Sequence, residues 1–506
     1  MTAKTFDWRQ PSVLLALLTV GIHLLVNGRY GFFRDELYFI VCGRHPAWGY
    51  VDQPPLIPLL AAGSRALFGD FLIGFRLVPM LAMAATVALT AEFAKLNGGG
   101  RFAQWLAGLC TLFAAMFLTV GLIFTTDTFQ ALTWLGCAWC LVRLEQSGDQ
   151  RWWLGFGAIA GVGLFGKYIV AFYLAALAAG LLFTPLRRSL GQRWVYLGVA
   201  LMLAIILPNL LWQISEGWPF LELGKAGAGG KNLALSPLDF LSQQLLLIGP
   251  LAAPVWIAGL WAGFVRPRLK VWRAFAIAYG LLFAIFIVIH GKAYYLSSIY
   301  PVVLGVGAVV LEGWLTRATW RALALGAVTV TGVLIAPMAV PVLSEANYLA
   351  YARALGVAPS ATASEHQRLG LLPQHFADMH GWPQMAAKVA AVWRALPPDE
   401  RARAVFFGQN YGEAAAIDVF GAGLGLPRAI GGHNNYYLWG PRGHDGSVVI
   451  AVGGDVAEYR RLFRSVTVAG ATDDPYAMPY ENRPIYVLRG MNPPLQTYWP
   501  KVKHYE

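Results

Sequence analysis

The sequence predicts a polytopic α-helical membrane protein with a small soluble α/β domain at its C-terminal end. Of the 506 residues, 57% are hydrophobic and only 13% are charged, and the mean hydropathy is +0.52. Charged residues make up roughly 25% of an ordinary soluble protein. From residue 11 to about residue 340, apolar runs of about 20 residues recur, each long enough to cross a bilayer. From about residue 345 the composition becomes that of a soluble domain.

We predict about eleven membrane spans, near residues 11–29, 73–94, 102–124, 128–143, 152–166, 168–185, 194–213, 241–264, 273–290, 296–314 and 321–341. The segment before the first span resembles the charged region of a signal peptide, but no small-residue cleavage site follows it. We therefore interpret residues 11–29 as a retained helix. Residues 55–69 are too short to span and begin with prolines, which favours an interfacial helix on the outer face.

The charges of the loops predict the orientation of the chain. With a cytoplasmic N-terminus, every inner loop is basic, as the positive-inside rule requires. The inner loops then contain Lys95 and Arg101, Arg143 and Arg151, Arg187, Arg188 and Arg193, Arg266, Arg268, Lys270 and Arg273, and Arg317 and Arg321. An odd number of spans places the C-terminal domain outside a bacterial cytoplasmic (inner) membrane. The net charge of +12 thus reflects anionic lipid headgroups and gives no indication of nucleic acid as a partner.

The predicted domains are residues 1–344, which form the membrane part, and residues 345–506, which form the soluble part. In the soluble part, residues 402–408, 448–453 and 484–489 have the pattern of strands, and residues 413–420 and 456–463 that of helices. Strands that alternate with helices predict an α/β domain. Gly161, Gly163 and Gly166 match a nucleotide-binding pattern, but they lie in a membrane span, where close helix packing explains them better.

A polar stretch, Gly31–Pro55 (GFFRDELYFIVCGRHPAWGYVDQPP), lies between two long apolar segments. Side chains this charged do not lie in hydrocarbon, so the stretch is a loop or a surface helix at the membrane boundary. Asp35 and Glu36 are adjacent and diverge by about 100° on a helix. One of them is a candidate general base for an attacking hydroxyl, while the other caps or orients a neighbour. The alternative is a solvated helix start paired with Arg34.

Two further acids are candidates, each with a structural alternative. Asp52 precedes Gln53 and two prolines that begin the interfacial helix, so it is a candidate for substrate binding or a simple helix cap. Asp127 lies at an outer mouth between two spans, where a carboxylate is costly unless it is paired, hydrated or bound to metal. Capping of the next helix by Thr125, Thr126 or Asp127 is the alternative. Asp35 and Asp127 are the candidate ligands if a divalent metal ion takes part.

Two lone cations complete the set of outer-face candidates. Lys167 is followed by Tyr168, and Lys292 is followed by Ala293 and Tyr294. Snorkelling lysines beside interfacial tyrosines are common and form the structural alternative. The functional interpretation is that these ammonium groups bind the phosphate or diphosphate of a lipid carrier and stabilise the leaving group. His290 is a candidate metal ligand or phosphate donor, or an ordinary histidine of the boundary.

Several of these segments together resemble bacterial members of glycosyltransferase family 39. The resemblance is carried by RDELYF, GYVDQPPLIPLL, TTDTF, GKYIVAFYL and HGKAYYLSSIYPVVL, and it covers about the first 345 residues. The family includes protein O-mannosyltransferases and lipid A aminoarabinose transferases. It implies a GT-C fold with interfacial outer-loop helices, and transfer of a sugar from a polyprenyl-phosphate donor to an acceptor hydroxyl with inversion.

Carried over by residue, the resemblance makes Asp35 the best base candidate, with Glu36 beside it, and Asp52 the acid before the paired prolines. In the aminoarabinose transferases a lysine usually follows that acid, whereas this chain has Gln53. The departure directs phosphate binding to Lys167 and Lys292, with Arg34 as a further candidate for the donor's phosphate, and argues against that particular sugar. Gln53, Tyr168 and Tyr294 are further substrate-binding candidates.

Two other functions compete with the transferase. A transporter, flippase or polymerase of lipid-linked saccharides would place essential polar residues deep in the spans. A non-catalytic membrane scaffold would tolerate neutralisation of the loop acids. The expected partners are therefore a polyprenyl-phosphate-linked sugar, an acceptor that is a protein, lipid A or another glycan, and membrane lipid.

Overall fold

The computed structural model describes residues 9–226, 233–265, 267–362 and 365–505. The chain divides into two compact units. The first contains Met1–Arg29, Ile73–Trp212 and Asn232–Ser344, and the second contains Tyr30–Leu72, Gln213–Lys231 and Glu345–Glu506. The polar stretch after the first helix thus belongs to the same unit as the C-terminal region. The predicted assignment of residues 1–344 to one domain stays a prediction.

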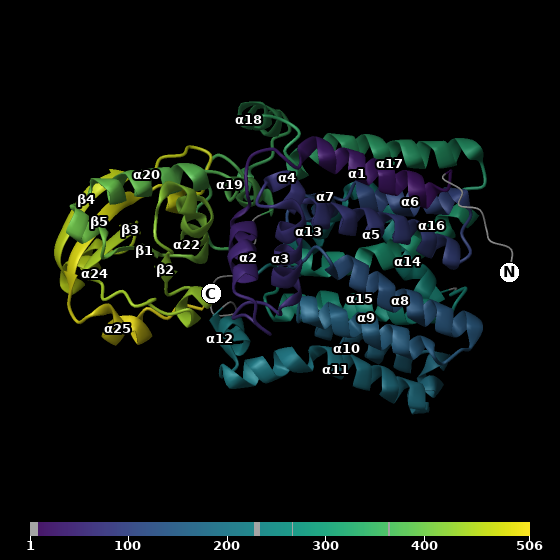
Figure 1. The fold of residues 1–506 in the computed structure, drawn as a ribbon. Coiled ribbons are helices and arrows are strands. Elements are labelled where there is room, and N and C mark those ends of the chain that lie inside the picture. The colour runs from purple at the N-terminus through teal and green to yellow at the C-terminus, as the bar shows by residue number, and fades with distance from the viewer. Residues whose placement is uncertain (1–8, 227–232, 266, 363–364, 506) are drawn as a thin grey trace. The chain divides into compact units, whose positions relative to one another are not determined.

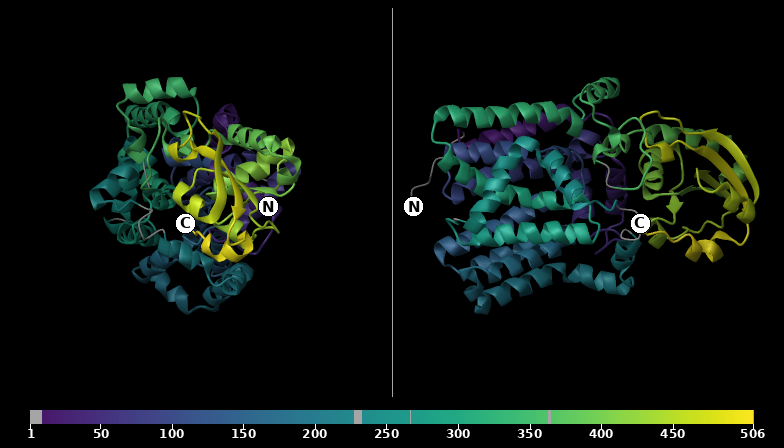
Figure 2. Two further views of the ribbon diagram at one scale, coloured as in Figure 1. Left: turned by 90° about the vertical axis from the view of Figure 1, so that its left-hand side faces the viewer. Right: turned by 180° about the vertical axis from the view of Figure 1, so that it is seen from behind.

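The first unit is a helical bundle whose members run side by side along a common direction (Figures 1 and 2). Apolar runs close their backbone hydrogen bonds within each helix, which is what a hydrocarbon environment requires. The helices are α1 (Pro11–Val26), α5 (Leu77–Leu96), α6 (Arg101–Leu112), α7 (Ala115–Leu122), α8 (Gln130–Ser147), α9 (Trp152–Gly166), α10 (Val170–Leu182), α11 (Arg193–Ser215), α13 (Pro237–Ile248), α14 (Ala253–Val265), α15 (Val271–Val288), α16 (Tyr300–Trp314) and α17 (Ala318–Ala339).

Each predicted span contains a helix, and the predicted class of helical membrane protein is confirmed. Within the described residues, five helices are long and apolar enough to cross a membrane, or up to eight if bent pairs count as single spans. Two of the predicted spans are bent. Residues 102–124 form α6 and α7, bent by 64°, and residues 241–264 form α13 and α14, bent by 97°. The second bend lies at Gly249, which has φ 98°, and at Pro250, which lacks a backbone donor.

Glycines let helices of the bundle approach closely. A Cβ atom on Gly307 of α16 would clash with the backbone carbonyl of Val255 in α14, and one on Gly259 would clash with that of Val303. In α9, Cβ atoms on Gly161 and Gly163 would collide with Ile205 and Thr133. The prediction that the glycine pattern in this span serves helix packing is therefore confirmed.

The second unit contains a sheet of five strands in the order β2-β1-β3-β5-β4. β1 (Ala404–Gly408) is parallel to both β2 (Ile430–Gly431) and β3 (Val448–Val452). β5 (Pro484–Met491) is antiparallel to β3 and to β4 (Phe463–Ala471). The three predicted strands are confirmed, whereas β2 and β4 are additional. β4 is an edge strand with many half-exposed residues, so it lacks the apolar run by which buried strands are recognised.

Helices cover the sheet and hold the polar stretch in this unit (Figure 1). α2 (Arg34–Arg44) packs on α22 (Tyr411–Ala416) and on α3 (Leu56–Phe68). The helix predicted at 413–420 begins at Tyr411 and continues as a π-helix over Ile417–Gly421. The other helices are α12 (Pro219–Ala226), α18 (Glu345–Ala354), α19 (Gln374–Ala377), α20 (Trp382–Ala395), α21 (Pro398–Arg401), α23 (Asn435–Leu438), α24 (Val456–Leu462) and α25 (Leu495–Tyr498).

The close contact between α14 and α16 gives a test of the bundle. Gly307→Ala forces a methyl group against the backbone of α14, so we expect a loss of about 1–3 kcal/mol and a lower thermal midpoint in detergent. Gly313→Ala in the same helix is the matched control, because a Cβ atom there meets nothing within 4 Å. An unchanged midpoint for Gly307→Ala would contradict this packing.

Candidate functional site

The first turn of α2 separates the roles of the two adjacent acids. Glu36 is fully buried, and its carboxylate accepts a hydrogen bond of 2.8 Å from the backbone N–H of Phe33, just before the helix. This contact satisfies a donor that the helix leaves unpaired. Asp35 points elsewhere and keeps 30% of its side chain exposed. The geometry therefore fits Glu36 as a helix cap and leaves Asp35 as the accessible acid.

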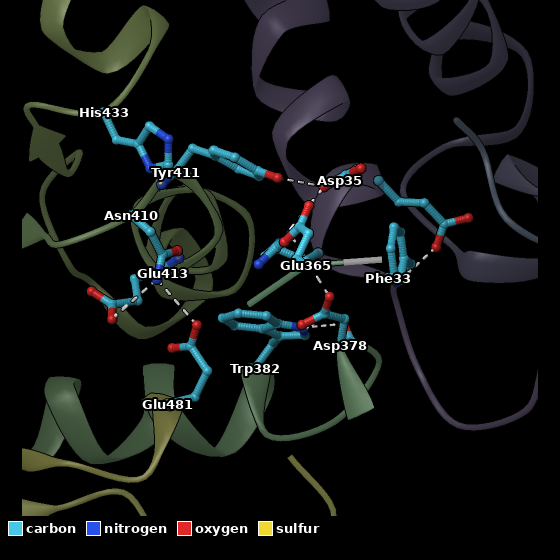
Figure 3. A network of polar contacts seen from close by, with 12 residues as sticks. Phe33, Asp35, Glu365, Asp378, Trp382, Asn410, Tyr411, Glu413, His433 and Glu481 are labelled. Atoms are coloured by element: carbon cyan, nitrogen blue, oxygen red, sulfur yellow. Dashed lines mark hydrogen bonds and ion pairs between the residues drawn. The ribbon is translucent and has the colours of Figure 1, made fainter. Parts of the chain in front are cut away.

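Asp35 is held by residues far away in the sequence (Figure 3). The hydroxyl of Tyr411 donates a hydrogen bond of 2.7 Å to Asp35 Oδ1, and the Nε atom of Arg34 lies 3.7 Å from the same oxygen. The guanidinium of Arg34 also lies 5.3 Å from the centre of the Tyr411 ring. Asp35 is thus a partly exposed carboxylate with a fixed orientation.

Asp52 belongs to the same group of residues. Tyr38, on α2, donates a hydrogen bond of 3.0 Å to Asp52 Oδ1, and the ring centres of Tyr38 and Tyr411 are 4.7 Å apart. Asn435 supports this arrangement, because its Oδ1 accepts hydrogen bonds from the Val51 N–H at 2.7 Å and from Tyr38 at 3.3 Å. Two tyrosines thus connect the carboxylates of Asp35 and Asp52. Gln53, which follows, has a buried side chain.

Arg34 is the buried cation of this group. Its Nη1 donates a hydrogen bond of 2.6 Å to the hydroxyl of Tyr480, and its Nη2 lies 3.7 Å from Asp378 Oδ2. Its backbone N–H donates to the carbonyl of Asp378 at 2.9 Å. Burial opposes the charge of Arg34, but Asp378, the two tyrosines and Asp35 together raise its pKa well above the ordinary value. Burial likewise raises the pKa of Asp378 to about 6, although Arg34 favours its ionised form.

Glu413 and Glu481 form a second group of carboxyl side chains in the same unit. Asn410 caps α22 by accepting a hydrogen bond from the N–H of Glu413, and its amide donates to Glu481 Oε1 at 3.1 Å (Figure 3). Burial, followed by the charge of Glu481, raises the pKa of Glu413 well above its ordinary value. Burial also raises the pKa of Glu481 to about 7. Both carboxyl groups therefore favour the protonated form.

The remaining candidates belong to the first unit, where Asp127 and Lys167 form an ion pair. The Nζ atom of Lys167 donates to both carboxylate oxygens of Asp127 at 2.7 Å. α8 begins at Gln130 without a side-chain cap, so Asp127 does not cap this helix. Thr125 instead accepts a hydrogen bond from the N–H of Asp127 at 3.2 Å. The structure thus joins two residues that the sequence presented as separate candidates.

Aromatic rings surround the lysines of the first unit. Lys167 Nζ lies 4.8 Å from the centre of the Tyr295 ring and 6.0 Å from that of Tyr294. Lys292 Nζ lies 5.9 Å from the same Tyr294 ring. Both ammonium groups therefore flank one tyrosine. Tyr168 donates a hydrogen bond of 2.6 Å to Asn209, and His290 adopts a positive φ of 51° where α15 ends.

Asp35, Glu36, Asp52 and Gln53 thus lie in the second unit, and Asp127, Lys167, Tyr168, His290, Lys292 and Tyr294 lie in the first. That the two sets form one pocket stays a prediction. Sequence reasoning missed Tyr38 and Asp378, although Asp378 stands among apolar residues as a visible signal.

The predicted divalent ion has little support from the residues that the structure describes. Among them, no group of three or more His, Cys, Asp and Glu side chains is arranged to hold a metal ion. Asp35 already accepts from Tyr411 beside Arg34, and Asp127 is paired with Lys167. These carboxylates, as placed, do not fit a metal centre within either unit. No step of the proposed reaction is assigned to a metal ion at these residues, and Asp35 and Asp127 stay predicted ligands only.

Comparisons with known proteins identify the fold. Residues 52–212 match the sequence profile of the family described as "Dolichyl-phosphate-mannose-protein mannosyltransferase". No curated protein matches the sequence significantly. Among solved structures, apo ArnT from Cupriavidus metallidurans is 16% identical, with 94% of this chain and 97% of that chain covered and a TM-score of 0.62.

Two further structures agree. ArnT from Cupriavidus metallidurans bound to undecaprenyl phosphate is 16% identical over the same shares of both chains, with a TM-score of 0.59. The oligosaccharyltransferase AglB from Archaeoglobus fulgidus is 12% identical, covers 87% of this chain and 69% of that chain, and gives a TM-score of 0.50. The predicted GT-C fold, with a small sheet-containing C-terminal part, is confirmed.

The buried carboxyl groups predict how stability depends on pH. Because the pKa of Glu481 is raised to about 7 in the folded chain, the folded state binds more protons than the unfolded state between about pH 4.5 and 7. Stability from this group therefore falls as the pH rises across that range. We compare the thermal midpoint of the wild-type protein with that of Glu481→Gln at each pH. We expect the wild-type midpoint to decrease relative to that of the variant as the pH is raised from 5 to 8. The exposed Glu216→Gln control should show the same dependence of the thermal midpoint on pH as the wild type. The same dependence in Glu481→Gln would refute the raised pKa of Glu481.

Proposed function

We propose that this protein is a membrane glycosyltransferase that moves a sugar from a polyprenyl-phosphate donor to an acceptor hydroxyl, with inversion at the anomeric carbon. We place the reaction on the extracytoplasmic face of a bacterial inner membrane, with the N-terminus in the cytoplasm and the C-terminal domain outside. The basic inner loops support this orientation. The fold comparisons support the reaction class, since solved structures with this fold are of ArnT bound to undecaprenyl phosphate and of AglB in complex with a dolichol-phosphate.

The observation that carries the proposal is the setting of Asp35. This carboxylate is partly exposed, and Tyr411 fixes the orientation of one of its oxygens. In the proposed reaction, the acceptor oxygen attacks the anomeric carbon and transfers its proton to Asp35. A new carbon–oxygen bond forms as the bond between the sugar and the phosphate breaks, and the polyprenyl phosphate leaves. A fixed carboxylate is suited to such proton transfer.

The lysines of the first unit suit the leaving group. Lys167 and Lys292 both lie about 6 Å from the Tyr294 ring, so two ammonium groups lie in one region of the bundle, and that of Lys167 is paired with Asp127. An ammonium group that approaches a phosphate stabilises the negative charge that develops on it. Arg34, the other candidate for the phosphate, lies in the second unit, where Asp378 and Tyr480 engage its guanidinium.

The base role of Asp35 is tested by Asp35→Asn in purified protein reconstituted with a polyprenyl-phosphate sugar and a candidate acceptor. Because asparagine cannot take the proton, we expect transfer to fall by about 10²–10⁴-fold. Asp399→Asn, an exposed acid whose pairing with Arg403 contributes little, is the control. Full transfer by Asp35→Asn would remove Asp35 from the base role. Movement of the lipid-linked sugar without a new glycosidic bond would favour the transporter or flippase alternative.

The phosphate role of the lysines predicts a different kinetic signature. Removing one charge-assisted contact costs roughly 1.5 kcal/mol or more, so Lys167→Gln and Lys292→Gln should each raise the donor KM about tenfold. Lys95→Gln, which removes a half-exposed lysine near the end of α5, should leave the donor KM unchanged. A donor KM at the wild-type value in both outer-loop variants would exclude these lysines from phosphate binding.

A further inference from the structure

A cavity lies in the second unit at the carboxyl ends of two parallel strands. Its walls include Gln409 and Asn410, which follow β1, and the turn of Gly453, Gly454 and Asp455, which follows β3. After β1 the chain crosses to β2 on one side, and it then returns to β3 on the other side of β1. The point where the strand order reverses in this way is where open α/β sheets commonly bind ligands. The cavity has a volume of about 510 Å³.

The two walls of this cavity are joined and rigid. Gln409 Nε2 donates a hydrogen bond of 2.8 Å to the hydroxyl of Tyr459, and that hydroxyl donates to the carbonyl of Gly453 at 3.0 Å. Gly453 and Gly454 have φ values of 65° and 87°, and a Cβ atom on Gly454 would clash with Tyr459. The glycine pair is therefore needed to bring this turn against Tyr459.

The lining is polar and close to neutral overall. Asp455 and Arg483 carry opposite charges, and the charge of Arg34 is balanced by Asp378, which is not itself a lining residue. Glu413, a further lining residue, is buried, and burial raises its pKa and so favours its neutral form. Side-chain amides and histidines supply further donors and acceptors, and Val452 is the sole aliphatic side chain among the described lining residues. A lipid tail would find almost no apolar contact there. A neutral molecule with many hydroxyl groups, each both donor and acceptor, matches the lining best.

The cavity also adjoins the proposed base. Tyr411 forms part of its wall, and the hydroxyl of the same side chain donates to Asp35 (Figure 3). Arg34 is likewise both a lining residue and a neighbour of Asp35. A ligand in the cavity would therefore extend toward the carboxylate that takes the acceptor proton.

We propose that this cavity, the β1–β3 crevice, binds an oligosaccharide segment of the acceptor, next to the hydroxyl that reacts. The inference rests on the proposed transferase function and adds the acceptor class to it: a glycan, free or attached to a lipid. Asp455 and Arg483 form hydrogen bonds with sugar hydroxyls, and the rings of Tyr411 and Tyr480 pack against the sugar.

Binding is tested with the full-length protein in detergent, by saturation-transfer NMR and calorimetry, using maltotriose, triacetylchitotriose and α-1,6-mannotriose as probes. A neutral serine- and threonine-containing hexapeptide is the competing probe. We expect saturable binding of at least one trisaccharide, weakened at least fivefold by Arg483→Gln and by Asp455→Asn. Asparagine can still cap α24, whose N-terminal N–H groups Asp455 holds. Arg460→Gln, an exposed arginine on α24 outside the cavity, should bind as the wild type does.

Three results would overturn the inference. These are no binding of any trisaccharide, wild-type binding by both cavity variants, and binding of the hexapeptide in place of the sugars. Asp35→Asn separates this inference from the proposed reaction, because it should lose transfer and keep trisaccharide binding. Trisaccharide binding in a protein that transfers no sugar would refute the reaction and leave the crevice as a carbohydrate site.

Discussion

The second unit depends on the contacts of one largely buried group, the guanidinium of Arg34. A charge removed from water is costly unless it is paired and fully hydrogen-bonded. Asp378 and Tyr480, more than 340 residues away in sequence, offset part of this cost: Tyr480 accepts a hydrogen bond from the guanidinium, and Asp378 lies within ion-pair distance of it. The first polar stretch and the C-terminal domain are therefore one folded body. The same requirement orients Asp35, since Tyr411 contacts both the guanidinium and the acid.

In the first unit, which is more apolar, a charged side chain is likewise paired with an opposite charge. An acid and a cation at the ends of different helices neutralise each other there, as the Asp127–Lys167 pair shows. In the proposed reaction, the phosphate of the donor would replace the Asp127 carboxylate as the partner of the Lys167 ammonium group. Tyrosine rings beside the lysines add favourable contacts with the cations without committing them to one geometry.

Sequence reasoning reached the fold class because hydrophobic length and loop charge are local signals. It also selected Asp35, Asp52, Asp127 and Lys167 as candidates, since isolated charges stand out against an apolar background. It did not find that Tyr411 holds Asp35, because 376 residues separate them and no local pattern records such a contact. Bends such as the one at Gly249 were missed for a related reason. A proline after a glycine marks a break in a helix, but hydropathy alone does not detect such a break.

The central claim, that this protein forms a glycosidic bond from a lipid-linked donor, is tested most directly by mass spectrometry of whole cells. The prenyl-phosphate sugars and the envelope glycans are compared between cells with and without the protein. If the protein forms this bond, cells that lack it should accumulate one prenyl-phosphate sugar. The same sugar should be missing from one envelope acceptor. Identical donor pools and identical glycans in the two strains would contradict it.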